Sequence, residues 1–360
     1  MAVAGPHLVY DISPHGFGHL AQSAGVVAAL RRRYPDLRLT LRCAHGAEVV
    51  SRFIPPPWDR ADPPPELGMA MLGPNDVDVD RSLAYYRDLH RDWHGLVRQE
   101  GARLADLRPD LLVANAGHVG LAAAQARGIP AVAVSSLDWY DIARAYFPPE
   151  AAPLLEPMRA AYAGAAAFIR LDPALPMADF PNCRSAGPVA RLGVDRRAAL
   201  LAGRPRCRHI ILVSFGGWPG QGPLQRVPMM EAVLWLVSDP ALAAPGRPDI
   251  LHADSLGLSF PDLVRSSDLV LTKPGYGMFV ESVCNGTRLL SLERPDWPET
   301  AGMVAWAERH GVTEALPPAV LNTPALDLAI TALLERPVPP PPHPTGGEDA
   351  AAIIAGLLRA

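Results

Sequence analysis

Two glycine-rich turns, one in each half of the chain, constrain the fold more than any other feature of this sequence. The first turn spans His15 to His19 (HGFGH), and the second spans Lys273 to Gly277 (KPGYG). Each turn follows an apolar run typical of a strand and precedes a segment with helical spacing. Glycines let backbone N–H groups approach a ligand closely, and a helix N-terminus favours negative charge such as a diphosphate. The two turns therefore predict two α/β domains that face a shared cleft.

Strand and helix patterns alternate along both halves. In the first half, strand patterns lie at 8–12, 37–42, 110–114 and 131–135, and helical patterns lie at 20–33, 83–107 and 121–127. In the second half, a strand pattern at 209–213 is followed by helical patterns at 227–237 and 260–266 and by a strand pattern at 269–271. Repeated β–α–β units with right-handed crossovers favour a parallel sheet that is covered by helices on both faces. The prediction is two doubly wound, Rossmann-like domains.

A change of composition marks the boundary between these domains. The 360 residues are long for one domain, and the stretch from 173 to 208 shifts to Pro, Asn, Gly and Arg, as a linker does. The predicted organisation is an N-terminal domain over 1–190, a C-terminal domain over 191–345 and a terminal helix over 346–360. A proline-rich stretch at 54–74 is expected to form a long surface loop beside the cleft.

Composition excludes several classes of function. The formal net charge is −4, so the chain lacks the concentrated basic face that a nucleic-acid binder needs. Its four cysteines lie far apart, which indicates neither a zinc site nor a disulfide framework and favours the reducing cytoplasm. No apolar run approaches the roughly 18 residues of a transmembrane segment, while peripheral membrane contact stays open. We therefore expect a cytoplasmic protein that binds small molecules.

The motifs of both halves resemble those of the two-domain glycosyltransferases with the GT-B fold. The second half carries the clearer likeness, at residues 267–277, Glu281, 289–292 and 294–299. These residues are similar to those of MurG-like proteins and of macrolide or plant UDP-sugar transferases. The turn from His15 to His19 is also similar to the glycosyltransferase-like N-terminal half of L-arabinokinases. The resemblance implies a nucleotide-sugar donor in the C-terminal domain, an acceptor in the N-terminal domain and a terminal helix that packs back on the N-terminal domain.

The donor site implied by this resemblance gathers residues from three turns. The turn at Gly275, Tyr276 and Gly277 would bind the diphosphate through backbone amides, with Lys273 as a nearby positive charge. The matching glutamate, Glu281, would accept hydrogen bonds from ribose hydroxyls, or it could merely complement the helix dipole.

Two further pairs complete the implied donor site. Gly216 and Gly217 would lend amides to the phosphates, or they could form only a tight turn. Asp296 and Glu299 would hold hydroxyls of the donor sugar, with a solvated loop as the alternative for Asp296.

Acceptor activation points to the first turn. Attack by a hydroxyl on an anomeric carbon needs a general base, and His19 lies where plant-type transferases place theirs, with His15 as the competing candidate. Such a histidine is often oriented by an aspartate at the end of a later strand, but this chain has Asn115 there, and an amide stabilises an imidazolium poorly. His118 and Asp138 are predicted acceptor-side residues. A helix cap for the histidines and a surface loop for Asp138 are the structural alternatives.

The sequence thus predicts a glycosyltransferase that moves a sugar from a nucleotide-diphosphate sugar to a small-molecule or lipid-linked acceptor. No metal site and no cofactor besides the nucleotide sugar as co-substrate are expected. Two alternatives stay open: a non-catalytic or regulatory nucleotide-sugar-binding protein, and a nucleotide-sugar epimerase or hydrolase on the same fold. Kinase and dinucleotide oxidoreductase activities are disfavoured, because a phosphate-binding GxxxxGK[ST] sequence is absent and the first turn lacks a third glycine at the required spacing.

Overall fold

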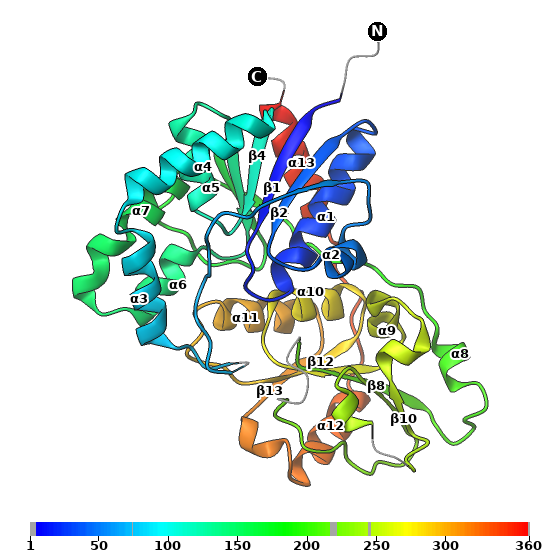
Figure 1. The fold of residues 1–360 in the computed structure, drawn as a ribbon. Coiled ribbons are helices and arrows are strands. Elements are labelled where there is room, and N and C mark those ends of the chain that lie inside the picture. Colours follow the sequence, from blue (N-terminus) through cyan, green and yellow to red (C-terminus); the bar gives the residue numbers. More distant parts are fainter. Residues whose placement is uncertain (1–4, 74, 217–221, 244–245, 359–360) are drawn as a thin grey trace. The chain divides into compact units, whose positions relative to one another are not determined.

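The computed structural model describes residues 5–73, 75–216, 222–243 and 246–358. The chain divides into two compact units (Figure 1). The first unit comprises 1–72, 76–189 and 345–360, and the second comprises 73–75 and 190–344. None of the described helices is long and apolar enough to cross a membrane.

The first unit is built on a parallel sheet in the order β3-β2-β1-β4-β5-β6-β7. Its strands are β1 (His7–Ile12), β2 (Arg38–Cys43), β3 (Asp59–Ala61), β4 (Leu111–Asn115), β5 (Ala131–Ser135), β6 (Ala167–Leu171) and β7 (Cys183–Ala186). The strand order reverses between β1 and β4, where Ile12 pairs with Asn115. In open α/β sheets, ligands bind outside the carboxyl ends of the strands at such a reversal.

Helices cover this sheet, and its central strands β1, β4 and β5 are buried along their whole length. They are α1 (Gly18–Arg33), α2 (Ala47–Phe53), α3 (Val79–Leu89), α4 (Trp93–Leu107), α5 (Val119–Ala126), α6 (Trp139–Tyr146), α7 (Ala152–Ala163) and α13 (Gly346–Leu357). The terminal helix α13 packs beside α1 within this unit (Figure 1). The approach is close, since a Cβ atom on Gly347 would lie 2.7 Å from the carbonyl oxygen of Gly25.

The second unit repeats the design with the sheet order β10-β9-β8-β11-β12-β13, again parallel. The strands are β8 (His209–Ser214), β9 (Val233–Val237), β10 (Ile250–His252), β11 (Leu269–Thr272), β12 (Arg288–Leu292) and β13 (Thr313–Leu316). The helices are α8 (Arg197–Leu201), α9 (Phe260–Ser266), α10 (Tyr276–Cys284), α11 (Thr300–His310) and α12 (Ala325–Glu335). Here the order reverses between β8 and β11, where Ser214 pairs with Thr272. Two such units confirm the predicted pair of Rossmann-like α/β domains.

Three local predictions need correction. The segment 227–237, predicted as a helix, contains the strand β9, because its VLWLV run is buried on both faces and pairs with β8. The predicted helix over 83–107 is two helices, since Asp92 caps α4 by accepting the Gly95 amide at 3.0 Å. The proline-rich stretch 54–74 contains the short strand β3.

Candidate functional site

The carboxyl end of the first sheet brings His19 and Asn115 together, at the point where the strand order reverses. His19 follows the turn after β1 and lies in the first turn of α1, whereas Asn115 ends β4. The His19 Nδ1 atom lies 2.6 Å from the Asn115 Oδ1 atom, and both side chains are buried. Residues 96 positions apart in the chain thus form one polar pair.

A chain of hydrogen bonds sets the orientation of this pair. The Asn115 Nδ2 group donates to Gln22 Oε1 at 3.1 Å, and Gln22 Nε2 donates to Ser136 Oγ at 2.8 Å. The amide of Asn115 therefore directs its oxygen at His19, which assigns the proton of the ring to Nδ1. Nε2 keeps the lone pair that a general base needs.

Burial makes this histidine a weak base. Removal from water lowers the pKa of His19 to about 4, and this effect is only partly opposed by the hydrogen bond that Asn115 accepts from the ring. A carboxylate in place of Asn115 would favour the imidazolium ion, whereas an amide only fixes the ring. The ring is consequently neutral at physiological pH and ready to accept a proton at Nε2.

His15 shares an aromatic neighbour with His19. Both rings lie against Trp139 of α6, with centroid separations of 4.9 Å for His15 and 5.7 Å for His19. Gly68 also lies close to Trp139, since a Cβ atom on Gly68 would lie 2.6 Å from its ring. The proline-rich stretch therefore contributes to the surroundings of the two histidines.

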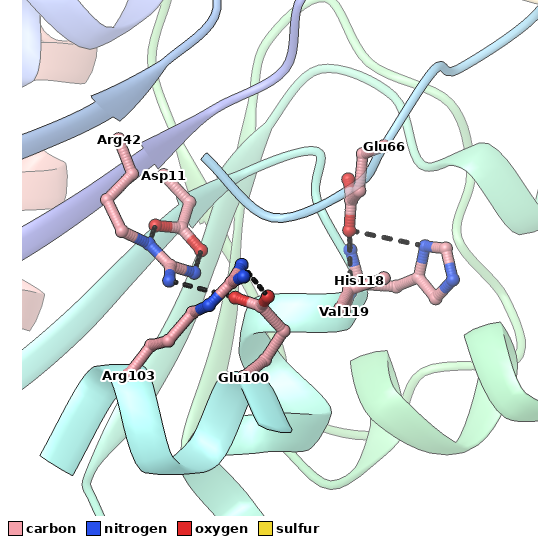
Figure 2. A network of polar contacts seen from close by, with 7 residues as sticks. All are labelled: Asp11, Arg42, Glu66, Glu100, Arg103, His118 and Val119. Carbon is pink, nitrogen blue, oxygen red and sulfur yellow. Dashed lines mark hydrogen bonds and ion pairs between the residues drawn. The ribbon is translucent and has the colours of Figure 1, made fainter. Parts of the chain in front are cut away.

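His118 belongs to a separate buried cluster, and Figure 2 shows its contact with Glu66. Its Nε2 atom lies 3.0 Å from Nε2 of His90, and its ring stacks on Trp93. Glu66 accepts the backbone amides of His118 and Val119 at 2.5 and 2.6 Å, so it caps the N-terminus of α5. Burial raises the pKa of the Glu66 carboxyl to about 8, against the opposing effect of the amide donors.

Asp138 also has a structural role as a helix cap. It is fully buried, and its Oδ1 atom accepts the Asp141 amide at 2.7 Å at the start of α6. Burial raises its pKa well above the ordinary value. The acceptor-side roles of His118 and Asp138 stay predictions.

A buried ion network lies at the end of β1, near Glu66 and His118 (Figure 2). Arg42 contacts both carboxylate oxygens of Asp11, at 2.6 and 2.8 Å, and one oxygen of Glu100 at 3.2 Å. Arg103 adds a contact to Glu100 at 2.7 Å. The network pairs two cations with two carboxylates and so compensates the burial of Arg42. Its role is to join the ends of β1 and β2 to α4.

In the second unit, the predicted donor turns meet at the corresponding reversal of strand order. Gly216 follows β8 with φ +85°, a left-handed conformation that favours glycine. A Cβ atom there would lie 3.6 Å from Cε of Lys273, which follows the neighbouring strand β11. Burial lowers the pKa of Lys273 to about 8, with a further contribution from the positive charge of Arg294. Gly217 lies outside the described residues.

Helix α10 begins directly after this lysine. Gly275 is its N-cap residue and has extended backbone, and Tyr276 and Gly277 form its first turn. Gly275 has no side chain, so the N-cap position itself supplies no side-chain cap to this helix. Lys273 and the N-terminus of this nine-residue helix thus concentrate positive potential at one edge of the sheet.

Glu281, on the same helix, is buried and already has a charged partner. Arg191 places Nε at 2.6 Å from Oε1 and Nη2 at 3.3 Å from Oε2 of this glutamate. The arrangement differs from a bare carboxylate that merely complements a helix dipole. Its predicted ribose contact stays a prediction.

The last predicted pair lies at the start of α11. Glu299 is buried as the N-cap residue of this helix and accepts the Trp297 indole N–H at 3.4 Å, whereas Asp296 is exposed. The guanidinium of Arg294 stacks over the Trp297 ring at 4.3 Å. Glu299 therefore has a fixed side chain, and Asp296 lies on the surface.

Three side chains of interest were not singled out from the sequence: Arg191, Glu66 and His90. Arg191 lies in the predicted linker and Glu66 in the predicted loop, and no local motif surrounds either. Only their distant partners give them a role. Among the described residues, no group of three or more His, Cys, Asp or Glu side chains is placed to hold a metal ion.

Comparison with known proteins finds similarity in structure alone. No protein-family model matches the chain, and no curated protein matches it. The calicheamicin glycosyltransferase CalG4 is similar with a TM-score of 0.62 and 16% identity over 99% of this chain and 95% of that one. UGT89C1 of Arabidopsis thaliana, complexed with UDP, has a TM-score of 0.63 and 13% identity over 99% of this chain and 100% of that one. A structure described as a UDP-N-acetylglucosamine 2-epimerase from Listeria monocytogenes has a TM-score of 0.57 and 15% identity over 98% of this chain and 95% of that one.

At these identities the likeness shows the fold, and it extends over nearly the whole chain. The GT-B fold predicted from the motifs is confirmed, with its two Rossmann-like domains. The more specific likenesses to MurG-like proteins and to L-arabinokinases stay predictions.

Proposed function

We propose that this protein is a glycosyltransferase that uses a nucleotide-diphosphate sugar as donor. The single observation that carries the proposal is the edge of the second sheet, where Lys273 and the N-terminus of α10 form a positive site and Glu281 lies one and a half turns further along the helix. A diphosphate matches the first two features, and a ribose matches the third. The similarity in structure to the calicheamicin glycosyltransferase CalG4 and to the UDP complex of UGT89C1 supports the same assignment.

The reaction follows from the chemistry of the two half-sites. The acceptor hydroxyl attacks the anomeric carbon of the donor sugar, and the bond from that carbon to the diphosphate oxygen breaks. The hydroxyl proton moves to Nε2 of His19, while the leaving diphosphate keeps the bonding electron pair. Lys273 and the α10 amides stabilise the charge that develops on the diphosphate. The acceptor is a small molecule or a lipid-linked hydroxyl compound, and no metal ion is needed in this scheme.

One observation favours a second candidate. Asn115 stands where a carboxylate would strengthen the base, and the pKa of His19 is low, so a nucleotide-sugar-binding protein without transferase activity is the alternative. An epimerase or hydrolase on the same fold would share the donor site but not require an acceptor. Donor turnover with and without added hydroxyl compounds separates the three.

Calorimetric titration with UDP, TDP, GDP and their sugar conjugates tests the proposal. We expect one nucleotide to bind and Glu281→Ala to weaken that binding by about tenfold or more, because a hydrogen bond to a charged group is lost at a buried site. Glu335→Ala, at an exposed carboxylate of the same unit outside the predicted donor site, is the matched control for a general effect of charge. If none of the nucleotides binds the wild-type protein, the proposal is wrong.

A further inference from the structure

We propose that Arg191 is a positioning residue that makes the donor site selective for ribonucleotides over 2′-deoxyribonucleotides. It does so by holding the Glu281 carboxylate in the orientation that receives the two neighbouring hydroxyls of a ribose. The inference rests on the proposed function and deepens it, because it names the class of nucleotide. UDP or GDP sugars would then be donors, and thymidine diphosphate sugars would be rejected.

The geometry of the ion pair supports this role. Arg191 contacts both oxygens of Glu281, at 2.6 Å from Nε to Oε1 and 3.3 Å from Nη2 to Oε2. Two contacts fix the plane of the carboxylate, as a single contact would not. A carboxylate offers about four acceptor positions, so each oxygen keeps one for another donor. Two remaining acceptors on adjacent oxygens match the 2′- and 3′-hydroxyls of a ribose.

Burial explains why the glutamate needs this partner. The side chain of Glu281 is 4% exposed and that of Arg191 is 23% exposed. Burying a carboxylate without a partner cation is costly. Arg191 thus compensates the burial of Glu281 and also orients it. Cys284 lies on the same helix, and burial, together with the charge of Glu281, raises the pKa of its thiol to about 12.

The segment that carries Arg191 is itself fixed to α9 and to the end of α10. Asn285, which follows α10, donates from Nδ2 to the Arg191 carbonyl at 3.0 Å and accepts the Gly193 amide at 2.9 Å. Asp262 of α9 accepts the Val194 amide at 2.7 Å.

Gly193 lies so close to α9 that a Cβ atom there would be 2.0 Å from the carbonyl oxygen of Pro261. The backbone that carries Arg191 is therefore fixed, so only side-chain freedom is lost when Arg191 orients Glu281.

The test compares UDP with 2′-deoxy-UDP by calorimetric titration, or GDP with 2′-deoxy-GDP where GDP is the nucleotide that binds. We expect the wild-type protein to prefer the ribonucleotide by about tenfold or more, since the missing hydroxyl leaves a charged acceptor unpaired. Arg191→Gln should reduce this preference to within about threefold and weaken UDP binding. Arg196→Gln is the matched control, because Arg196 lies on the same segment and pairs with Asp262 at 3.9 Å instead of with Glu281. It should keep the wild-type preference.

A general loss of structure would weaken the binding of both nucleotides alike and so leave the ratio of the two affinities unchanged. Arg191→Lys provides a second variant. Lysine keeps the charge but cannot make the two-point contact, so it too should lose selectivity while retaining the thermal stability of the wild type more closely. An unchanged preference in Arg191→Gln, or tighter UDP binding, would overturn the inference, the latter because Arg191 would then compete with the ribose. Equal binding of both nucleotides by the wild type overturns this inference alone, whereas the proposed function fails only if no nucleotide binds.

Discussion

At the scale of the residue, burial and the partner of His19 together set how basic the ring is. An amide holds the imidazole but adds no negative charge, and burial brings the pKa of His19 to about 4. The folded protein therefore binds this proton less readily than the unfolded chain, whose histidine has its ordinary pKa of 6.5. Stability from the neutral ring is present above pH 6.5 and is lost as the pH falls from 6.5 towards 4.

Asn115→Asp should raise the pKa of His19 towards its ordinary value and increase donor turnover by about tenfold or more, because the carboxylate stabilises the imidazolium. Titration of the ring by NMR measures the first effect, and release of the nucleoside diphosphate measures the second. Asn115→Ala is the control: it removes the orientation of the ring without adding charge, so turnover should fall. A pKa of His19 that does not move in Asn115→Asp would contradict the role given to this pair.

At the scale of the element, the start of α5 depends on a residue more than fifty positions away. Glu66 accepts the first amides of this helix, and Gly117 leaves room for it, since a Cβ atom there would lie 2.7 Å from Oε2. Glu66→Ala should lower the free energy of unfolding by about 1 kcal/mol, the usual contribution of a helix cap. Chemical denaturation measures this change.

Glu66→Gln tests the charge separately, because glutamine keeps an acceptor for the amides. Burial raises the pKa of Glu66 from its ordinary 4.5 to about 8, so the folded state holds this proton more tightly than the unfolded state. The stabilising effect is complete below pH 4.5 and is lost as the pH rises through 8. The wild type should thus lose stability relative to Glu66→Gln between pH 5 and 8.5. A constant difference over this range would show that the carboxyl is already ionised at pH 5.

At the scale of the whole molecule, the sequence predicts what depends on local pattern. The strand run LLVAN and the turns at Gly18 and Gly275 are predicted correctly, because a buried parallel strand is largely apolar and each turn contains glycines at the start of a helix. The pattern of the VLWLV run predicts a helix, whereas the structure has a strand, since a short apolar run has no period of its own and only pairing with β8 decides its form.

The candidate site divides in the same way. The residues near the glycine turns could be found from the sequence, and the structure brings His19 to Asn115. The partners of Glu281 and of the α5 amides could not be found, because Arg191 and Glu66 lie in a linker and a loop whose sequences carry no helical or strand period. Contacts over such separations depend on the packing of the complete domain.

Hydrogen–deuterium exchange of the protein, with and without a saturating nucleoside diphosphate, tests whether the donor binds at the second sheet. Amides at the start of α10 should exchange more slowly in its presence, together with those of residues 214–216 after β8, because these groups are predicted to bind the phosphates. Protection confined to the first unit, with the turn at Lys273 to Gly277 unchanged, would contradict the assignment of the second sheet as the donor site.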